Sequence, residues 1–260
     1  MKESLKGFFS LEGKVALVTG GNGGIGKGIT RGLAGAGATM VIAARNEAKT
    51  ADAVREIEKD FGVKVMGVKV DVRKEDDIYA MVKKAEDKFG RVDIFVANAG
   101  MAIHKLPQDM STAEWDENIE TNLRSFFIGA KAVYPLMKKQ GGGKIISNGS
   151  MTAIFGVGAL PAYGASKGGI VQLTRSLAVA WAKDNIQVNC ILPGWINTDL
   201  SAGGKKDIPG LEQGVIARTP AGRWGDPVDL AAAAVFLAGP GSAFVTGVAI
   251  PVDGGFAVMA

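Results

Sequence analysis

Short apolar runs alternate with longer amphipathic stretches along most of this chain, and that alternation limits the folds it can adopt. The short runs are apolar at nearly every position, which is typical of strands buried on both faces of a sheet. Strands that alternate with helices predict an α/β fold, a doubly wound parallel sheet of about seven strands with helices on both faces. The predicted strands are 14–19, 39–44, 64–70, 92–98, 143–150, 186–192 and 247–255, and the predicted helices are 24–36, 47–61, 75–89, 113–139, 162–184 and 227–238.

The composition predicts one folded domain. Hydrophobic residues make up 47% and charged residues 22% of the chain, which is enough for a large core and too apolar for disorder. No stretch has the composition of a linker, so we predict a single domain over residues 1–260. The stretch from about 195 to 226 is too long for an ordinary connection, and we expect it to be an irregular lid over an active site.

Charge and cysteine content limit the kinds of binding partner and the cellular compartment that we expect for this protein. The net charge of +4 is scattered, so it indicates no nucleic-acid stripe, although it suits an anionic cofactor or substrate. Cys190 is the single cysteine, as expected in a reducing compartment. No secretory signal and no run of roughly 18 apolar residues is found, so we expect a cytoplasmic protein with no membrane partner. No Cys, His, Asp and Glu cluster has metal-ligand spacing, so we expect no metal.

The first predicted strand runs directly into TGGNGGIG, residues 19–26, and then into a helix. Glycines at such a turn let the backbone approach a ligand, and the helix N-terminus offers free N–H groups to a pyrophosphate. Gly20, Gly24 and Gly26 carry this prediction. An ordinary turn is the alternative, because the chain has 37 glycines, but the position in the first strand–turn–helix unit favours a dinucleotide site.

The end of the second predicted strand bears on the choice between NADP(H) and NAD(H). An acid there would bind the adenosine 2′-hydroxyl, whereas an arginine would accommodate a 2′-phosphate. Ala44 stands where the acid is expected and Arg45 follows it, which favours NADP(H). Arg45 as a solvated helix-start residue is one alternative, and Glu47 as a ribose ligand, which would favour NAD(H), is another.

Tyr163 and Lys167 lie four residues apart in YGASK, within a predicted helix. Residues at this spacing are neighbours on one helical face, so the ammonium group can lower the pKa of the phenol. That change would make the phenol a usable general acid or base at neutral pH. An ordinary pair on a helix surface is the alternative.

The ordered set of motifs resembles the short-chain dehydrogenase/reductase family, from about Gly13 to Gly255. Its members are TGGNGGIG, ANAG at 97–100, Asn122, Ser150, YGASK and PGWINT at 193–198. The resemblance implies a Rossmann fold and a nicotinamide-dependent oxidoreductase. It implies that Asp71 and Val72 contact the adenine and that Thr198 binds the nicotinamide carboxamide. The implied cofactor residues are Gly20, Asn22, Gly24, Ile25, Gly26, Arg45, Asp71, Val72, Asn98, Ala99, Gly100, Tyr163, Lys167, Pro193, Gly194, Ile196 and Thr198.

The resemblance also implies a catalytic tetrad of Asn122, Ser150, Tyr163 and Lys167. In this scheme Tyr163 donates a proton to the carbonyl oxygen that receives charge from the hydride transfer, and Ser150 adds a second hydrogen bond. Lys167 lowers the pKa of Tyr163 and holds the nicotinamide ribose, while Asn122 positions a water behind Lys167. Gly23 departs from the family, because many NADP-using members carry a basic residue there.

We therefore predict hydride transfer between NADP(H) and a small carbonyl or secondary alcohol substrate, of the sugar, sugar acid or 3-oxoacyl type. The alternatives are a catalytically silent cofactor-binding protein, an NAD-preferring dehydrogenase and a nucleotide-sugar epimerase. The sequence leaves open whether His104, Lys205 and Lys206 contact the substrate. Two long predicted helices, at 113–139 and 162–184, carry wide apolar faces, and the resemblance implies that such helices pair to give a homotetramer or a homodimer.

Overall fold

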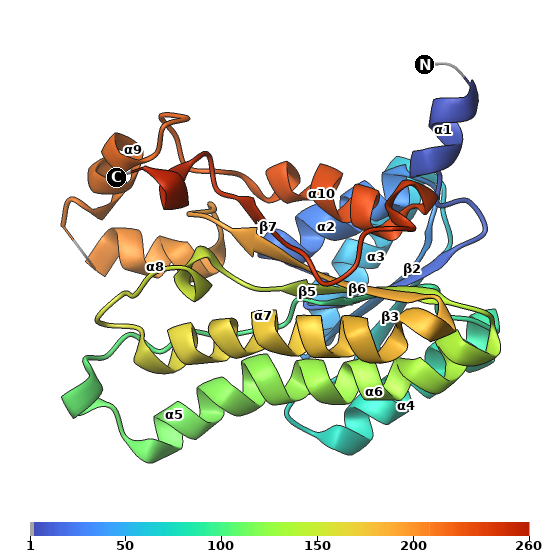
Figure 1. Cartoon of the computed structure of the whole chain (residues 1–260), viewed down its shortest axis with the longest axis horizontal. Coiled ribbons are helices and arrows are strands. Elements are labelled where there is room, and N and C mark those ends of the chain that lie inside the picture. The colour runs from blue at the N-terminus through green and yellow to red at the C-terminus, as the bar shows by residue number, and fades with distance from the viewer. Residues whose placement is uncertain (1–2, 208, 260) are drawn as a thin grey trace.

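The computed structural model describes residues 3–207 and 209–259. Its centre is one parallel sheet of seven strands in the order β3-β2-β1-β4-β5-β6-β7 (Figure 1). All seven predicted strands are confirmed within this sheet. The strands are β1 Val15–Thr19, β2 Thr39–Ala44, β3 Val65–Lys69, β4 Ile94–Ala97, β5 Gly143–Asn148, β6 Ile186–Pro193 and β7 Ala249–Val252.

Helices cover both faces of the sheet, as predicted. In Figure 1, α4, α6 and α7 lie below the sheet, while α2, α3 and α10 lie above it. The order of the strands reverses at β1, which lies between β2 and β4. The helices are α1 Glu3–Phe9, α2 Gly24–Gly35, α3 Glu47–Phe61, α4 Glu75–Phe89, α5 Thr112–Ile119, α6 Ser125–Lys139, α7 Pro161–Trp181, α8 Asp199–Asp207, α9 Leu211–Arg218 and α10 Ala231–Ala238.

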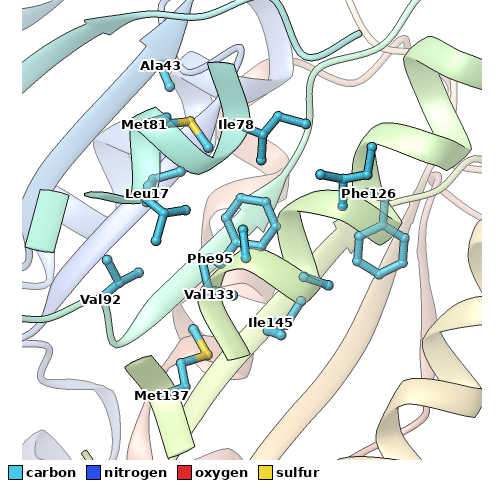
Figure 2. Close-up of a cluster of buried hydrophobic side chains, with 14 of the residues drawn as sticks. Leu17, Ala43, Ile78, Met81, Val92, Phe95, Phe126, Val133, Met137 and Ile145 are labelled. Atoms are coloured by element: carbon cyan, nitrogen blue, oxygen red, sulfur yellow. The ribbon is translucent and has the colours of Figure 1, made fainter. Parts of the chain in front are cut away.

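Strand β1 shows why the apolar runs are nearly continuous. Its side chains alternate between two separate cores: Leu17 faces the core under α4 and α6, whereas Val18 faces the core under α2 and α10. Figure 2 shows the first of these cores, in which Phe95 of β4 lies between Leu17 and α6. Every position of β1 is buried, because a strand covered on both faces has no side that meets water.

The predicted helix 113–139 is interrupted in the structure. A π-helical turn, Glu120–Arg124, separates α5 from α6 and contains Asn122. Single π turns within α-helices are frequent at functional sites. Periodicity did not indicate this turn, because one wider turn shifts the apolar stripe only slightly. The sequence analysis also did not predict α1, which is short and precedes the first strand.

The predicted irregular lid, residues 195–226, contains two helices, so that part of the prediction is wrong. In α8, Asp199 lies in the first turn and Lys205 and Lys206 lie in the last, an arrangement that the helix dipole favours. Helix α9 has the same polarity, with an acid at its start and Arg218 at its end. Three glycines in these helices lower helix propensity and hid the pattern. We call residues 195–226 the lid segment below.

Candidate active site

A cleft of about 490 Å³ opens at the carboxyl ends of the strands, where the strand order reverses. Ligands of open α/β sheets bind at this position. Fourteen of the predicted cofactor residues line the cleft, together with a set that the sequence analysis did not select. The fourteen are Gly20, Asn22, Gly24, Ile25, Gly26, Arg45, Asp71, Val72, Asn98, Ala99, Gly100, Tyr163, Lys167 and Thr198.

Three predicted cofactor residues, Pro193, Gly194 and Ile196, do not line the cleft. Pro193 ends β6 and is buried. A Cβ on Gly194 would lie 2.6 Å from the Cα of Asp253, so this glycine permits close packing of two backbones. Ile196 is buried and bridges to Gly225 within the lid segment. These residues lead from β6 to Thr198, which lines the cleft.

The glycine turn is shaped by backbone contacts. Gly20 and Gly24 have positive φ angles of 66° and 48°, which side chains rarely adopt. A Cβ on Gly26 would lie 2.1 Å from the carbonyl oxygen of Gly20 and 2.4 Å from Nδ2 of Asn98. Helix α2 begins at this turn with no side-chain cap on Gly23, so its first N–H groups face the cleft without a side-chain partner. The turn therefore fits a pyrophosphate.

Asn98 fixes the floor of the cleft. Its Nδ2 donates a hydrogen bond to the carbonyl of Thr19 at 2.9 Å, and its Oδ1 accepts one from Nδ2 of Asn148 at 2.9 Å. Oδ1 of Asn148 and Oγ1 of Thr121 are buried at the cleft, and neither atom forms a hydrogen bond with a described residue. Buried polar atoms without partners are rare, so these two atoms are suited to a polar ligand. The sequence analysis missed both residues, although Asn148 lies within the predicted strand 143–150 and ends β5 in the structure.

Basic side chains line the end of the cleft where the adenosine is expected. Arg45 and Lys49 both line it, and Nζ of Lys49 lies 2.9 Å from the place where a Cβ of Gly23 would stand. Lys49 therefore brings a positive charge to the position where the chain lacks the basic residue of many NADP-using relatives. Glu47 does not line the cleft, and its carboxylate pairs with Lys69 at 3.5 Å. This pairing disfavours Glu47 as a ribose ligand.

Two further contacts define this end. Lys49 pairs with Asp199 of α8 at 2.9 Å, so an ion pair joins α3 to the lid segment. Both oxygens of Asp71 accept hydrogen bonds from the Arg73 guanidinium, at 3.0 and 2.6 Å. That guanidinium lowers the pKa of Asp71 to about 2. Asp71 is therefore an anchored carboxylate at the wall of the cleft, and Arg73 lines the same wall.

The structure brings Tyr163, Lys167 and Ser150 together. Lys167 is buried, its Nζ donates to the carbonyl of Asn148 at 2.7 Å, and it lies 5.4 Å from the centre of the Tyr163 ring. Burial lowers the pKa of Lys167 to about 8. The nearby Ser150 hydroxyl lowers the pKa of Tyr163, but burial is the larger effect and raises that pKa overall.

The predicted lowering of the Tyr163 pKa by Lys167 is therefore wrong for this structure. The amine contacts the ring face and a backbone carbonyl rather than the phenolic oxygen, and desolvation of the phenol dominates. Tyr163 is accordingly held in its protonated form at neutral pH, which is the form that donates a proton. The geometry that the spacing predicted, with both groups on one face of α7, is present.

Asn122 lies behind the cleft and does not line it, and neither does Ser150. The Asn122 side chain accepts a hydrogen bond from the N–H of Met101 at 2.9 Å and donates one to the carbonyl of the same residue at 2.9 Å. It also donates to the Ser166 hydroxyl at 3.0 Å. Asn122 therefore joins the π-helical turn to the end of β4 and to the residue that precedes Lys167.

The other side chains singled out from the sequence lie outside this arrangement. Cys190 is buried in β6, and His104 is exposed. Lys205 pairs with Glu212 at 2.8 Å. Within the described part of the chain, no group of three or more metal-ligating side chains is found. The described helices include none that is both long and apolar enough to cross a bilayer.

A glycine turn at the switch point of a doubly wound sheet defines a dinucleotide-binding fold. Known proteins agree with this class. A family model described as enoyl-(acyl carrier protein) reductase matches residues 20–257. The 2-dehydro-3-deoxy-D-gluconate 5-dehydrogenase of Formosa agariphila is 42% identical over 248 residues, which cover 95% of this chain and 94% of that protein.

Two further relatives are similar over their full length. The 3-oxoacyl-(acyl-carrier-protein) reductase of Vibrio cholerae is 39% identical, with 95% of this chain and 98% of that protein covered. The crystal structure of a gluconate 5-dehydrogenase from Burkholderia cenocepacia, in complex with NADP and tartrate, superposes with a TM-score of 0.93 at 35% identity. The match covers 98% of this chain and all of that one. The chain belongs to the short-chain dehydrogenase/reductase family and is an oxidoreductase by its relatives.

Proposed function

We propose that this protein transfers a hydride between NADP(H) and a carbonyl or secondary alcohol of the sugar acid or 3-oxoacyl type, with Tyr163 as the general acid and base. The observation that carries the proposal is the convergence of Ser150 and Lys167 on Tyr163 beside the cleft. Relatives that act on such substrates support it.

The side chains of this protein would donate the proton to the carbonyl oxygen and stabilise the negative charge that develops on it. The bound nicotinamide would supply the hydride chemistry. Tyr163, protonated at neutral pH because burial raises its pKa, donates its proton to the carbonyl oxygen. The Ser150 hydroxyl hydrogen-bonds the same oxygen as negative charge grows on it. Lys167, whose pKa of about 8 lies close to neutral, can supply the proton that restores Tyr163, and this proton must pass through a relay because the amine contacts the ring face rather than the phenolic oxygen.

The preference for NADP(H) rests on the two cations at the adenosine end. Arg45 and Lys49 line the cleft beside the uncapped turn. Among the described residues, Lys49 forms an ion pair with the exposed Asp199, whereas Arg45 forms none. A 2′-phosphate would meet both cations, whereas a 2′-hydroxyl would not need them. Binding of 2′,5′-ADP compared with 5′-ADP tests this preference directly, and equal affinity for the two would contradict it.

A screen of carbonyl and alcohol substrates with NADPH and NADH in parallel tests the reaction. The Tyr163→Phe variant removes only the phenolic oxygen, and we expect it to lose roughly 100- to 10,000-fold in kcat while it still binds NADPH. Tyr79→Phe, on the outer face of α4, is the matched control and should keep full activity. Unchanged turnover in Tyr163→Phe would remove that residue from its role, and NADPH binding without any turnover would favour a silent cofactor-binding protein.

Three further features stay proposals. We propose that residues 1–260 act as a single domain in the cytoplasm, and that the lid segment covers the substrate, since its residues Thr198 to Leu200 line the cleft. We also propose a homodimer or homotetramer that buries the outer faces of α5, α6 and α7, where Trp115, Phe127 and Val179 are exposed. Sedimentation of the wild type and of Val179→Lys tests the assembly, and a monomeric wild type would contradict it.

A further inference from the structure

The cations on the lid side of the molecule differ in whether a carboxylate holds them. Lys105 pairs with Glu114 at 2.6 Å, Lys205 with Glu212 at 2.8 Å and Arg223 with Asp229 at 2.7 Å. Arg218, the last residue of α9, makes no ion pair and no side-chain hydrogen bond with the residues that the structure describes. Its guanidinium therefore keeps its hydrogen-bond donors for another partner.

Two aromatic rings hold the Arg218 guanidinium in place. It lies 4.4 Å from the centre of the Phe256 ring and 5.5 Å from that of Phe155. The centres of the Phe155 and Phe256 rings lie 5.7 Å apart, and the centre of the Trp195 ring lies 6.3 Å from that of Phe256. Stacking on aromatic faces is favourable for a guanidinium and leaves its edge open for a planar anion. The charge is thus oriented although no carboxylate neutralises it.

Phe155 connects this guanidinium to the chain segment that follows Ser150. The chain makes a 3-10 turn, Met151–Ala153, directly after Ser150, and the N–H of Ala153 donates to the carbonyl of Ser150 at 3.0 Å. Phe155 follows within the next turn, where its N–H donates to the carbonyl of Met151 at 3.4 Å. The carbonyl of Thr152 lies 3.9 Å from the place of a Cβ on Gly164, the residue after Tyr163. Arg218 is exposed and does not line the cleft, and Phe155 links it to the segment that follows Ser150.

We propose that Arg218 binds the carboxylate of an anionic substrate whose carbonyl or hydroxyl group meets Tyr163. A planar guanidinium with two parallel N–H groups matches a carboxylate. A single unpaired cation held by aromatic rings suits one carboxylate on a small molecule. A neutral 3-oxoacyl thioester has no group that requires it. The inference rests on the proposed function and selects the sugar acids among its substrate classes.

Arg218→Met tests the inference, because methionine keeps much of the length and the aromatic contact but removes the charge. The substrates are 2-dehydro-3-deoxy-D-gluconate, D-gluconate with its neutral methyl ester, and a 3-oxoacyl thioester. For the sugar acid that the wild type uses, we expect KM to rise roughly 10- to 100-fold with kcat nearly constant, as for the loss of a hydrogen bond between charged groups. The ester and the thioester should be unaffected by the substitution.

Two further variants control for structure and for charge. Arg218→Lys keeps the charge without the planar donors, so its KM should lie between those of the wild type and Arg218→Met. Arg55→Met removes an exposed arginine of α3 and should change nothing. Dissociation constants for D-gluconate, measured by calorimetry on the NADPH-loaded protein, should follow the same order as the KM values.

The outcomes separate this inference from the proposed function. If Arg218→Met weakens the acid and the ester equally, or neither, Arg218 does not bind the carboxylate. If the wild type turns over only neutral carbonyls or thioesters, the inference fails and the oxidoreductase proposal stands. If no substrate is turned over and no nicotinamide cofactor binds, the proposed function itself fails.

Discussion

The glycine turn and the lid segment both contain glycine, but only the turn requires it for a close contact. At Gly26 a Cβ would lie 2.1 Å from a backbone oxygen, whereas at Gly214 of α9 a Cβ would meet nothing within 4 Å. The first glycine is required by the contact of two backbone segments, and the second is a surface helix residue. At the turn two backbone segments approach each other closely, so the requirement for glycine appears as a fixed spacing in the sequence. In the lid segment we propose that side chains select the substrate, and no fixed spacing in the sequence identifies those side chains.

The largest expected effect is at the turn. In Gly26→Ala, the new methyl group must displace the Gly20 carbonyl or the Asn98 amide, and both shape the cleft. We expect the protein to lose at least about 2 kcal/mol of stability, as for other overpacked sites, and NADPH affinity to fall at least tenfold. Denaturant unfolding and calorimetric titration with NADPH measure the two. Wild-type affinity in a folded Gly26→Ala protein would show that the turn does not hold the pyrophosphate.

The next largest effect is expected at Lys167, because this lysine is buried, whereas Lys205 of the lid segment is only half-buried and pairs with Glu212. Burial lowers the Lys167 pKa from 10.5 to about 8. Between those two pH values the unfolded chain binds a proton that the folded chain does not, so stability rises as pH increases from 8 to 10.5. The full difference is on the order of 3 kcal/mol. Below pH 8 the penalty for the buried ammonium is present throughout.

Urea unfolding at several pH values checks this sign. Lys167→Met should flatten the rise between pH 8 and 10.5. Part of the rise should remain, because burial also lowers the pKa of Lys144 to about 8. Lys205→Met, which removes a lysine of the lid segment that pairs with Glu212, should leave the slope as in the wild type. An identical slope in Lys167→Met and the wild type would mean that Lys167 is not desolvated.

Lys49 and Asp199 form an ion pair that joins the region of the glycine turn to the lid segment. Lys49→Met removes one of the two cations proposed for the 2′-phosphate, and we expect NADPH to bind roughly tenfold more weakly while NADH binding changes less than about twofold. Asp199→Asn leaves Lys49 without its competing carboxylate and should strengthen NADPH binding slightly. Titration of both cofactors into both variants measures this. Equal losses for NADPH and NADH in Lys49→Met would place Lys49 away from the 2′-phosphate.

The same contrast explains what could be predicted from the sequence. All seven strands were predicted, because a strand covered on both faces must be apolar at nearly every position, as β1 shows. The glycine turn and the Tyr163–Lys167 pair were found because local geometry fixes their spacing, whereas Asn98 was predicted from the resemblance to the family. The pKa direction of Tyr163 was wrong, because burial by residues distant in the sequence outweighs a neighbour one helical turn away.

The missed residues depend on contacts between distant segments. Thr121 lies in a π turn that no periodicity indicates, and Lys49 matters only because α3 brings it beside Gly23. Arg218 is informative only once Phe155 and Phe256 are seen beneath it. Helices α8 and α9 were missed because their glycines lower helix propensity, while the tertiary structure still forms them. No local pattern in a single sequence predicts contacts between segments that are distant in that sequence.

The smallest expected effect is at Gly214, and it bears on whether the lid segment needs glycine at all. Gly214 lies in α9, has open space at its Cβ, and its N–H donates to the carbonyl of Gly210 at 2.9 Å. Alanine favours a helix over glycine by roughly 0.5 to 1 kcal/mol, so Gly214→Ala should stabilise the protein by up to that amount without any change in NADPH affinity. A loss of turnover with unchanged stability would instead show that α9 must unwind during the reaction, and the lid segment would then be a moving element whose glycines are as necessary as those of the turn.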